Sequence, residues 1–338
     1  AIRDKRISAV ETLEAHLAHI AHVNGSIQAI VTLDEEGARQ RAREADEALA
    51  RGEVWGPLHG VPMTLFDMYD VAGMRTTWMG NPAFADHVPD RESIVVTRLR
   101  NAGAIFMGRT NDDHGFFDEG RLFPLPVHPW DASRALTGIG APASALATGM
   151  TPLELGVDAG SAQMPTHVVG VFALRPTLHR VPMADLFQNP IDHVFNTGNY
   201  APVARNIEDL RLALEVIAGP DGVDMEMPPM PLGEFAAPGL SDLRIAWASR
   251  LPGSVMDDEI AAGIETFAGR LASEGVTMAQ RLPPIDFEAM LKLFDNLLFM
   301  PYAAVNEGSD EPGPSLGEFM KVWHERETVN RSWEAFLG

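Results

Sequence analysis

Apolar residues recur every three or four positions along several stretches of this chain, a spacing that predicts helices with one buried face. The first such helix is predicted over residues 7–22, built on Ile7, Val10, Leu13, Leu17 and Ile20. A second, rich in alanine and charge, is expected over residues 35–50 and ends before Gly52. Further helices are predicted over residues 91–102, 140–150, 207–218, 257–273, 285–306 and 315–337. Asp90, preceded by Pro89, is expected to cap the helix over residues 91–102.

Short apolar runs between these helices predict strands over residues 26–33, 61–66, 104–108, 243–248 and 276–282. Because strands and helices alternate with short connections, the chain is expected to form a sheet with helices on its faces, an α/β fold.

Residues 220–240 hold many prolines and glycines and predict a connector. The connector is either a domain boundary or a surface loop within one domain. Since the alternation of strands and helices continues on both sides, a single domain over residues 1–338 is favoured.

Composition narrows the classes of partner. The formal net charge of −21 repels phosphate backbones and anionic membranes, so neither nucleic acid nor a membrane surface is expected as a partner. The chain has no cysteine, which excludes disulfides, thiolate catalysis and cysteine-based zinc sites. No uninterrupted apolar run reaches the roughly 18 residues of a membrane span, and the first residues lack the apolar core of a signal peptide. A cytoplasmic protein is expected.

Several motifs occur in a fixed order. Residues 156–165 have the sequence Gly-Val-Asp-Ala-Gly-Ser-Ala-Gln-Met-Pro, and Gly-Val-Phe-Ala-Leu-Arg-Pro-Thr follows over residues 170–177. Earlier motifs are Gly-Pro-Leu-His-Gly-Val-Pro over 56–62, Gly-Arg-Thr-Asn over 108–111 and Pro-Trp-Asp over 129–131, and Pro-Val-Ala-Arg follows over 202–205. In this order they resemble the amidase-signature family. The resemblance implies a single mixed sheet flanked by helices on both faces, hydrolysis of a carboxylic amide, no cofactor, and truncation of this chain at both ends.

The family's chemistry uses a serine nucleophile, a bridging cis-serine and a lysine base, while backbone N–H groups of a glycine-rich turn stabilise the oxyanion. The resemblance places Ser161 at the nucleophile position. It places Asp158, Ala159 and Gly160 in the oxyanion turn, which is one glycine shorter than the family pattern. A helix N-cap is the alternative role for Ser161.

At the other two catalytic positions the residue types differ from the family. Phe66 stands at the lysine position and Gly138 at the cis-serine position. The next lysine after Lys5 is Lys292, so no shift of the alignment by one or two residues supplies a base. Thr137 becomes a substitute hydroxyl if the alignment slips by one residue. Pocket positions Met68, Ile139 and Gln163 complete a site that is largely apolar.

Two other arrangements of polar residues are weaker candidates. Asp192 and His193 would complete a Ser-His-Asp arrangement with Ser161, but adjacent residues do not normally orient one another in that way. A second polar cluster is explained better by a solvated loop than by a metal site, and consists of Asp112, Asp113, His114 and Asp118. No metal is therefore expected.

Three hypotheses follow. The chain is an amide hydrolase with a variant mechanism, or a catalytically silent homologue that binds a small molecule or a partner, or its motifs were engineered or misassigned in places. Loss of a general base typically lowers a rate about 10² to 10⁴-fold, which weighs against ordinary turnover. The expected ligand is a small-molecule amide or a related compound, and the resemblance implies a homodimer.

Overall fold

The computed structural model describes residues 1–111, 121–134, 136, 139–158, 163–183, 198–225, 227–230, 232–233, 238–305 and 313–338. The chain divides into two compact units, Ala1–Leu232 and Gly233–Gly338. The boundary between them falls within the connector predicted over residues 220–240.

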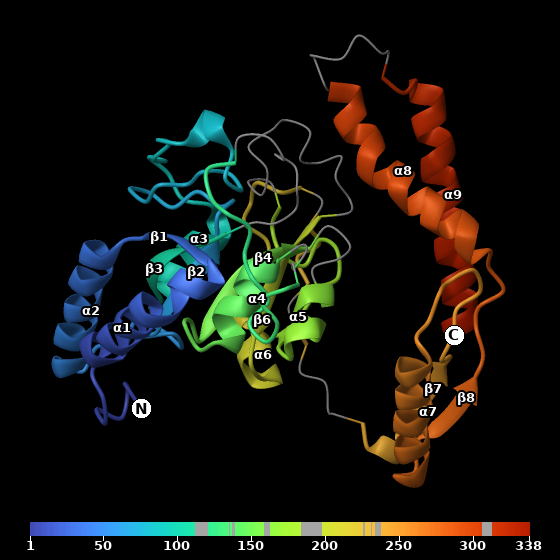
Figure 1. Ribbon diagram of the computed structural model, residues 1–338, viewed down its shortest axis with the longest axis horizontal. Helices are drawn as coiled ribbons and strands as arrows, with labels where there is room; N and C mark the ends of the chain where they lie inside the picture. Colours follow the sequence, from blue (N-terminus) through green and yellow to red (C-terminus); the bar gives the residue numbers. More distant parts are fainter. Residues whose placement is uncertain are drawn as a thin grey trace. The chain divides into compact units, whose positions relative to one another are not determined.

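The first unit alternates helices and strands along most of its length (Figure 1). Its helices are α1 (Ala9–Ile27), α2 (Glu35–Ala50), α3 (Ile94–Asn101), α4 (Gly140–Ala147), α5 (Gln163–Val169) and α6 (Ile207–Ile217), with the 3₁₀ turn η1 (Pro82–Phe84). Its strands are β1 (Ile30–Leu33), β2 (Pro62–Phe66), β3 (Ile105–Thr110), β4 (Leu153–Asp158), β5 (Phe172–Ala173) and β6 (Asn199–Ala204).

These strands form one mixed sheet in the order β1-β3-β2-β4-β6-β5. β2 runs parallel to both β3 and β4, whereas β1, β6 and β5 pair antiparallel with their neighbours. Two clusters of buried apolar side chains accompany the sheet: α1 and α2 contribute to one, α3 and α6 to the other, and α4 to both. The prediction of an α/β fold with a mixed sheet flanked by helices is confirmed.

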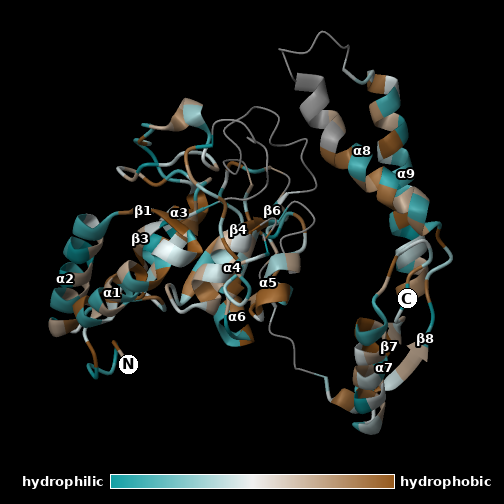
Figure 2. Ribbon diagram, in the orientation of Figure 1, coloured by the Kyte–Doolittle hydropathy of each residue, from teal (hydrophilic) through white to brown (hydrophobic). Residues whose placement is uncertain are grey.

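The first two helices show how local sequence sets the boundaries. Ser8 and Glu11 form a reciprocal capping box at the start of α1, and Gln28, with a φ of 59°, ends the helix in the left-handed region. α1 therefore extends to Ile27, and the strand predicted over residues 26–33 was wrong in its first four positions. α2 has the predicted bounds; Figure 2 shows it as mostly hydrophilic, and it buries a row of alanines.

The predicted cap of α3 was also wrong. Ser93, not Asp90, is the N-cap residue, and the helix begins at Ile94. Tertiary contacts explain the later start: Arg91 pairs with Asp70 at 3.4 Å, and the Ser93 N–H donates to the Asp70 carbonyl at 3.0 Å. Ser93 itself is extended, with a φ of −60° and a ψ of 146°, so the helix cannot begin before Ile94.

The second unit contains η3 (Leu240–Asp242), β7 (Arg244–Trp247), α7 (Asp258–Ser273), β8 (Thr277–Gln280), α8 (Phe287–Val305) and α9 (Leu316–Leu337). β7 and β8 pair in parallel as a two-stranded sheet. Asp257 caps α7, and Ser315 with Glu318 forms a capping box at the start of α9. Among the described residues of both units, no helix is long and apolar enough to cross a bilayer.

Candidate active site

The position that the resemblance assigns to the base is the last residue of a central strand. Phe66 ends β2, which lies between β3 and β4, and its side chain is fully buried. Phe66 pairs with Thr110 of β3. Because β2 and β4 are parallel neighbours, Phe66 lies at the same edge of the sheet as the carboxyl end of β4. Ligand and catalytic groups in open α/β sheets commonly gather at that edge.

Asp158 ends β4 and is the first residue of the predicted oxyanion turn. Its side chain is fully buried, and Arg175 holds it: the Arg175 Nη1 lies 3.1 Å from the Asp158 Oδ1 and donates to the Asp158 carbonyl at 2.9 Å. The structure therefore places the lysine position and the start of the oxyanion turn on neighbouring strand ends.

α4 begins two residues after Gly138, the predicted cis-serine position, and packs on β4. Ile139 is the N-cap residue of α4 and lies against Gly156 of β4, where a Cβ atom would stand only 3.1 Å from the Ile139 Cδ1. Glycine at position 156 thus allows the close approach of α4.

Three of the predicted site residues belong to the core. Phe66, Met68 and Ile139 are all buried in the larger apolar cluster of the first unit. Because the Phe66 side chain is buried in this cluster, it adds to the packing of the sheet. The backbone carbonyl of Phe66 accepts a hydrogen bond from the Arg109 guanidinium at 3.4 Å.

Several predicted residues lie outside the residues that the structure describes: Thr137, Gly138, Ala159, Gly160, Ser161, Asp112, Asp113, His114, Asp118, Asp192 and His193. Their roles stay predictions. Gln163 is the first residue of α5.

Sequence reasoning missed a buried carboxyl two strand positions before Gly156. Glu154 of β4 is fully buried, accepts a hydrogen bond from the Thr64 hydroxyl and a second from the Thr110 hydroxyl at 3.3 Å. Burial raises the pKa of Glu154 to about 8, against the opposing effect of these two hydroxyls. The carboxyl is therefore mostly protonated at neutral pH. Its signal in the sequence was one charged residue inside the otherwise apolar run over residues 153–157.

A buried charged side chain, that of Arg109, also contacts the backbone of Phe66. Arg109 is fully buried and donates to the Tyr69 carbonyl at 2.6 Å and to the Thr76 hydroxyl. Burial lowers the pKa of Arg109 to about 10, so the guanidinium stays charged at neutral pH. Asp67 accepts from the Thr77 N–H at 3.0 Å; burial raises the pKa of Asp67, and the charge of Arg109 opposes that shift.

Comparison with known proteins decides the family. A family model described as Amidase matches residues 11–334. The chain belongs to the amidase family. The acylamidase of Rhodococcus erythropolis is 34% identical over 269 residues, a match that covers 77% of this chain and 55% of that protein. The indoleacetamide hydrolase of Bradyrhizobium diazoefficiens is 34% identical over 290 residues, covering 83% and 58%. The chain therefore spans little more than half the length of these relatives.

Solved structures of amidases agree with the fold. The native peptide amidase of Stenotrophomonas maltophilia matches with a TM-score of 0.76 and 26% identity, over 90% of this chain and 64% of that one. A bacterial aryl acylamidase of the amidase-signature family matches with a TM-score of 0.83 over 99% of this chain and 75% of that one. At 20% identity the second match supports the fold alone.

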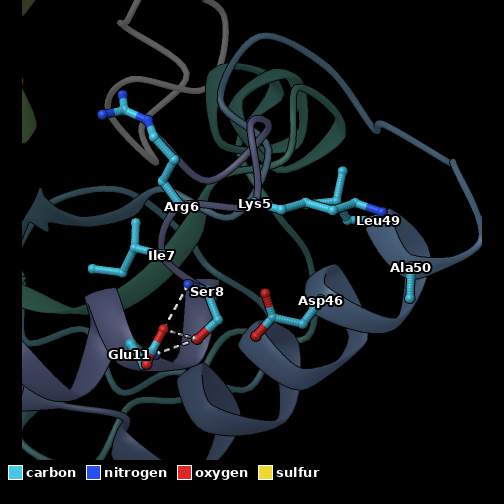
Figure 3. A pocket seen from close by; sticks show the side chains of 8 residues that line it. All are labelled: Lys5, Arg6, Ile7, Ser8, Glu11, Asp46, Leu49 and Ala50. Atoms are coloured by element: carbon cyan, nitrogen blue, oxygen red, sulfur yellow. Dashed lines mark hydrogen bonds between the residues drawn. The ribbon is translucent and has the colours of Figure 1, made fainter.

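One surface cavity of this amidase-family chain lies away from these strand ends. It has a volume of about 340 Å³ and is lined by the N-terminal segment, the start of α1 and the end of α2, including Lys5, Ser8, Glu11 and Asp46 (Figure 3). Its carboxylates already bind the backbone: Glu11 accepts from the Ser8 N–H at 2.8 Å, and Asp46 accepts from the Ala9 N–H at 2.7 Å. Both acids therefore bind backbone N–H groups at the start of α1.

Among the residues that the structure describes, no group of three or more histidine, aspartate or glutamate side chains is arranged to hold a metal ion.

Proposed function

We propose that the chain hydrolyses a carboxylic amide, with Ser161 as the nucleophile, at a rate well below that of a complete serine, cis-serine and lysine triad. Membership of the amidase family supports the reaction class. The observation that carries the proposal is the position of Asp158. It ends β4 next to the end of β2, is held by Arg175, and stands three residues before Ser161 in the sequence.

The proposed reaction has two steps. The Ser161 Oγ bonds to the carbonyl carbon, its proton is released, the C–N bond breaks, and the amine leaves after taking up a proton. Water then attacks the resulting ester, which releases the carboxylic acid and restores the serine hydroxyl. Phe66 cannot accept the serine proton, so we expect the first step to be slower by about 10² to 10⁴-fold than with a positioned base.

A second candidate function is binding of an amide or a related small molecule without turnover. Phe66 and Ile139 favour it over turnover, because these buried apolar side chains stand at positions where the resemblance expects polar groups. Apolar sites with few polar groups bind ligands without activating them.

The partners and location are further proposals. We propose that neither nucleic acid nor a membrane surface is a partner, because the net charge of −21 repels both, and that the chain is cytoplasmic. We propose a homodimer, to be measured by light scattering at several concentrations. A mass that stays at the 36.7 kDa of one chain at every concentration would contradict it.

The deciding experiment is intact-mass analysis after exposure to a fluorophosphonate, together with release of aniline from an acyl anilide. The matched control is Ser161→Ala. Covalent labelling and slow aniline release that both vanish in the control support hydrolysis. A folded chain that binds the anilide but shows neither labelling nor release supports the binding function instead.

A further inference from the structure

Three strand ends meet through side chains at the carboxyl edge of β4. Asp158 ends β4 and pairs with Asn199, the first residue of β6. Arg175 follows β5, which pairs with β6 on its other side. The order β4-β6-β5 thus brings a residue after β5 within reach of the end of β4.

The contacts at this edge cross β6. Arg175 reaches past β6 to bind both the carboxylate and the carbonyl of Asp158, at 3.1 and 2.9 Å. The Asn199 Nδ2 donates to the Pro176 carbonyl at 2.8 Å. Asp158 and Asn199 are fully buried, whereas the Arg175 side chain is 31% exposed. Two neighbouring residues, Arg175 and Pro176, are therefore each tied to the end of a different strand.

We propose that Arg175 is a positioning residue for the nucleophile turn. It fixes the last residue of β4, which stands three residues before Ser161 in the sequence. The inference rests on the proposed function, since Ser161 is taken as the nucleophile.

The chemistry of the pair suits this role. A charged guanidinium that binds a buried carboxylate makes stronger hydrogen bonds than a neutral donor does. Binding the carbonyl of the same residue also restrains the ψ angle of Asp158, the last residue before the segment that holds Ser161. Displacement of a reacting group by about 1 Å can lower a rate about 10²-fold, so a loose strand end would affect Ser161 without touching it.

The test compares substitutions of two arginines on the same segment. Arg175→Met removes the guanidinium but keeps most of the side-chain volume, and Arg175→Lys retains the charge. Arg180→Met is the matched control, because the Arg180 Nη1 also donates to a backbone carbonyl, that of Met230 at 3.1 Å, away from β4. Circular dichroism and the melting temperature establish that each variant is folded.

The first readout is the rate of fluorophosphonate labelling of Ser161. We expect Arg175→Met to lower it about 10 to 100-fold, Arg175→Lys to restore part of the loss, and Arg180→Met to leave it unchanged. Equal rates in Arg175→Met and Arg180→Met would overturn the inference. So would a loss that Arg175→Lys fails to relieve while its fold is intact.

The second readout does not depend on reactivity. Hydrogen exchange of peptides that cover residues 156–166 should be faster in Arg175→Met than in the parent chain, and unchanged in Arg180→Met. If the parent chain is not labelled at all, the proposed nucleophile fails, and this exchange alone decides the positioning role. Unchanged exchange in Arg175→Met would then overturn it.

Discussion

The Thr64 hydroxyl donates a hydrogen bond to the carboxyl of Glu154, and the two residues lie opposite each other in the adjacent parallel strands β2 and β4. Thr110 of β3 donates to the other oxygen of the same carboxyl. Three central strands of the sheet therefore share one buried acid. Its protonation state bears on the stability of the whole sheet.

This acid predicts how stability changes with pH. The pKa of Glu154 is raised to about 8 in the folded chain, above its ordinary value of 4.5. The folded chain then holds one more proton than the unfolded chain between these values, so the free energy of unfolding should fall as pH rises from about 5 to 8. In Glu154→Gln this decline should be smaller. Urea titrations at pH 5, 6.5 and 8 measure the difference.

The comparison of parent and variant isolates Glu154, because the remaining ionisable groups are common to both chains. Identical pH slopes for parent and variant would show that Glu154 ionises normally in the folded state. Thr64→Val serves as a second check, since it removes a donor to the carboxyl without removing the carboxyl.

Gly156→Ala should destabilise the first unit. The new methyl would meet the Ile139 Cδ1 at 3.1 Å and the Ala201 carbonyl oxygen at 3.4 Å. Overpacking of this kind typically costs about 1–3 kcal/mol. Ile139→Val removes the nearest atom, so the double variant should be more stable than the sum of the single changes predicts. The urea midpoints of the four chains measure this coupling.

A glycine in the second unit provides the control. Gly263 lies within α7, and a Cβ atom there would meet nothing within 4 Å. Gly263→Ala should be neutral or stabilising by about 0.5–1 kcal/mol, because alanine favours the helix. A loss of stability from both substitutions alike would exclude the contact with Ile139 as the cause.

Restoring the two replaced triad positions should raise amide hydrolysis. Phe66→Lys with Gly138→Ser supplies the base and the bridging hydroxyl, and we expect aniline release to rise by about 10² to 10⁴-fold over the parent. Phe66→Met with Gly138→Ser is the matched control, since it adds the hydroxyl without a base. Equal rates in both double variants would contradict the assignment of position 66.

Phe66→Lys should also lower the free energy of unfolding. Phe66 is fully buried in the core, where truncation of a phenylalanine to alanine typically costs about 3–5 kcal/mol; a lysine there adds the cost of burying its amine. The double variants are therefore to be assayed at low temperature, with circular dichroism as the check on folding.

Arg98 should stabilise the folded chain, because it binds carbonyl groups at and just after the C-terminal end of α6. Its guanidinium donates to the carbonyls of Ile217, Gly219 and Pro220 at 2.5, 2.8 and 2.9 Å. Arg98→Met should cost about 1–3 kcal/mol, because these carbonyls lose a charged donor. The control is Arg211→Met on α6 itself, where an exposed pair with Glu215 is expected to contribute under about 1 kcal/mol. Equal losses in both variants would contradict the role of Arg98.

Much of the fold could be predicted from sequence. The bounds of α2 follow from its alanine spacing and the Asp34 cap, and the family motifs implied the mixed sheet. β4 and β6 were not among the predicted strands. Glu154 and Gly156 interrupt the apolar run of β4, and Pro202 lies in the middle of β6, where a residue without an N–H argues against a strand.

The candidate site was predictable only in part. Phe66 was located correctly at the end of a strand. The contact of Arg175 with Asp158 depends on the order of strands that are distant in sequence, which periodicity does not reveal. Glu154 and Arg109 are charged residue types that are rarely buried, so their place in the core becomes visible only once their partners are brought together.

The cap that Asp46 provides for α1 has a consequence for the order of folding. Asp46 binds the N–H groups of Ala9 and Val10, which are 37 and 36 residues away in sequence, whereas the contact of Thr64 with Glu154 spans 90 residues. Chains are synthesised at about 5–20 residues per second, so β4 follows β2 after several seconds or more. The pair α1 and α2 can therefore dock during synthesis, well before the central strands that carry the candidate site have met.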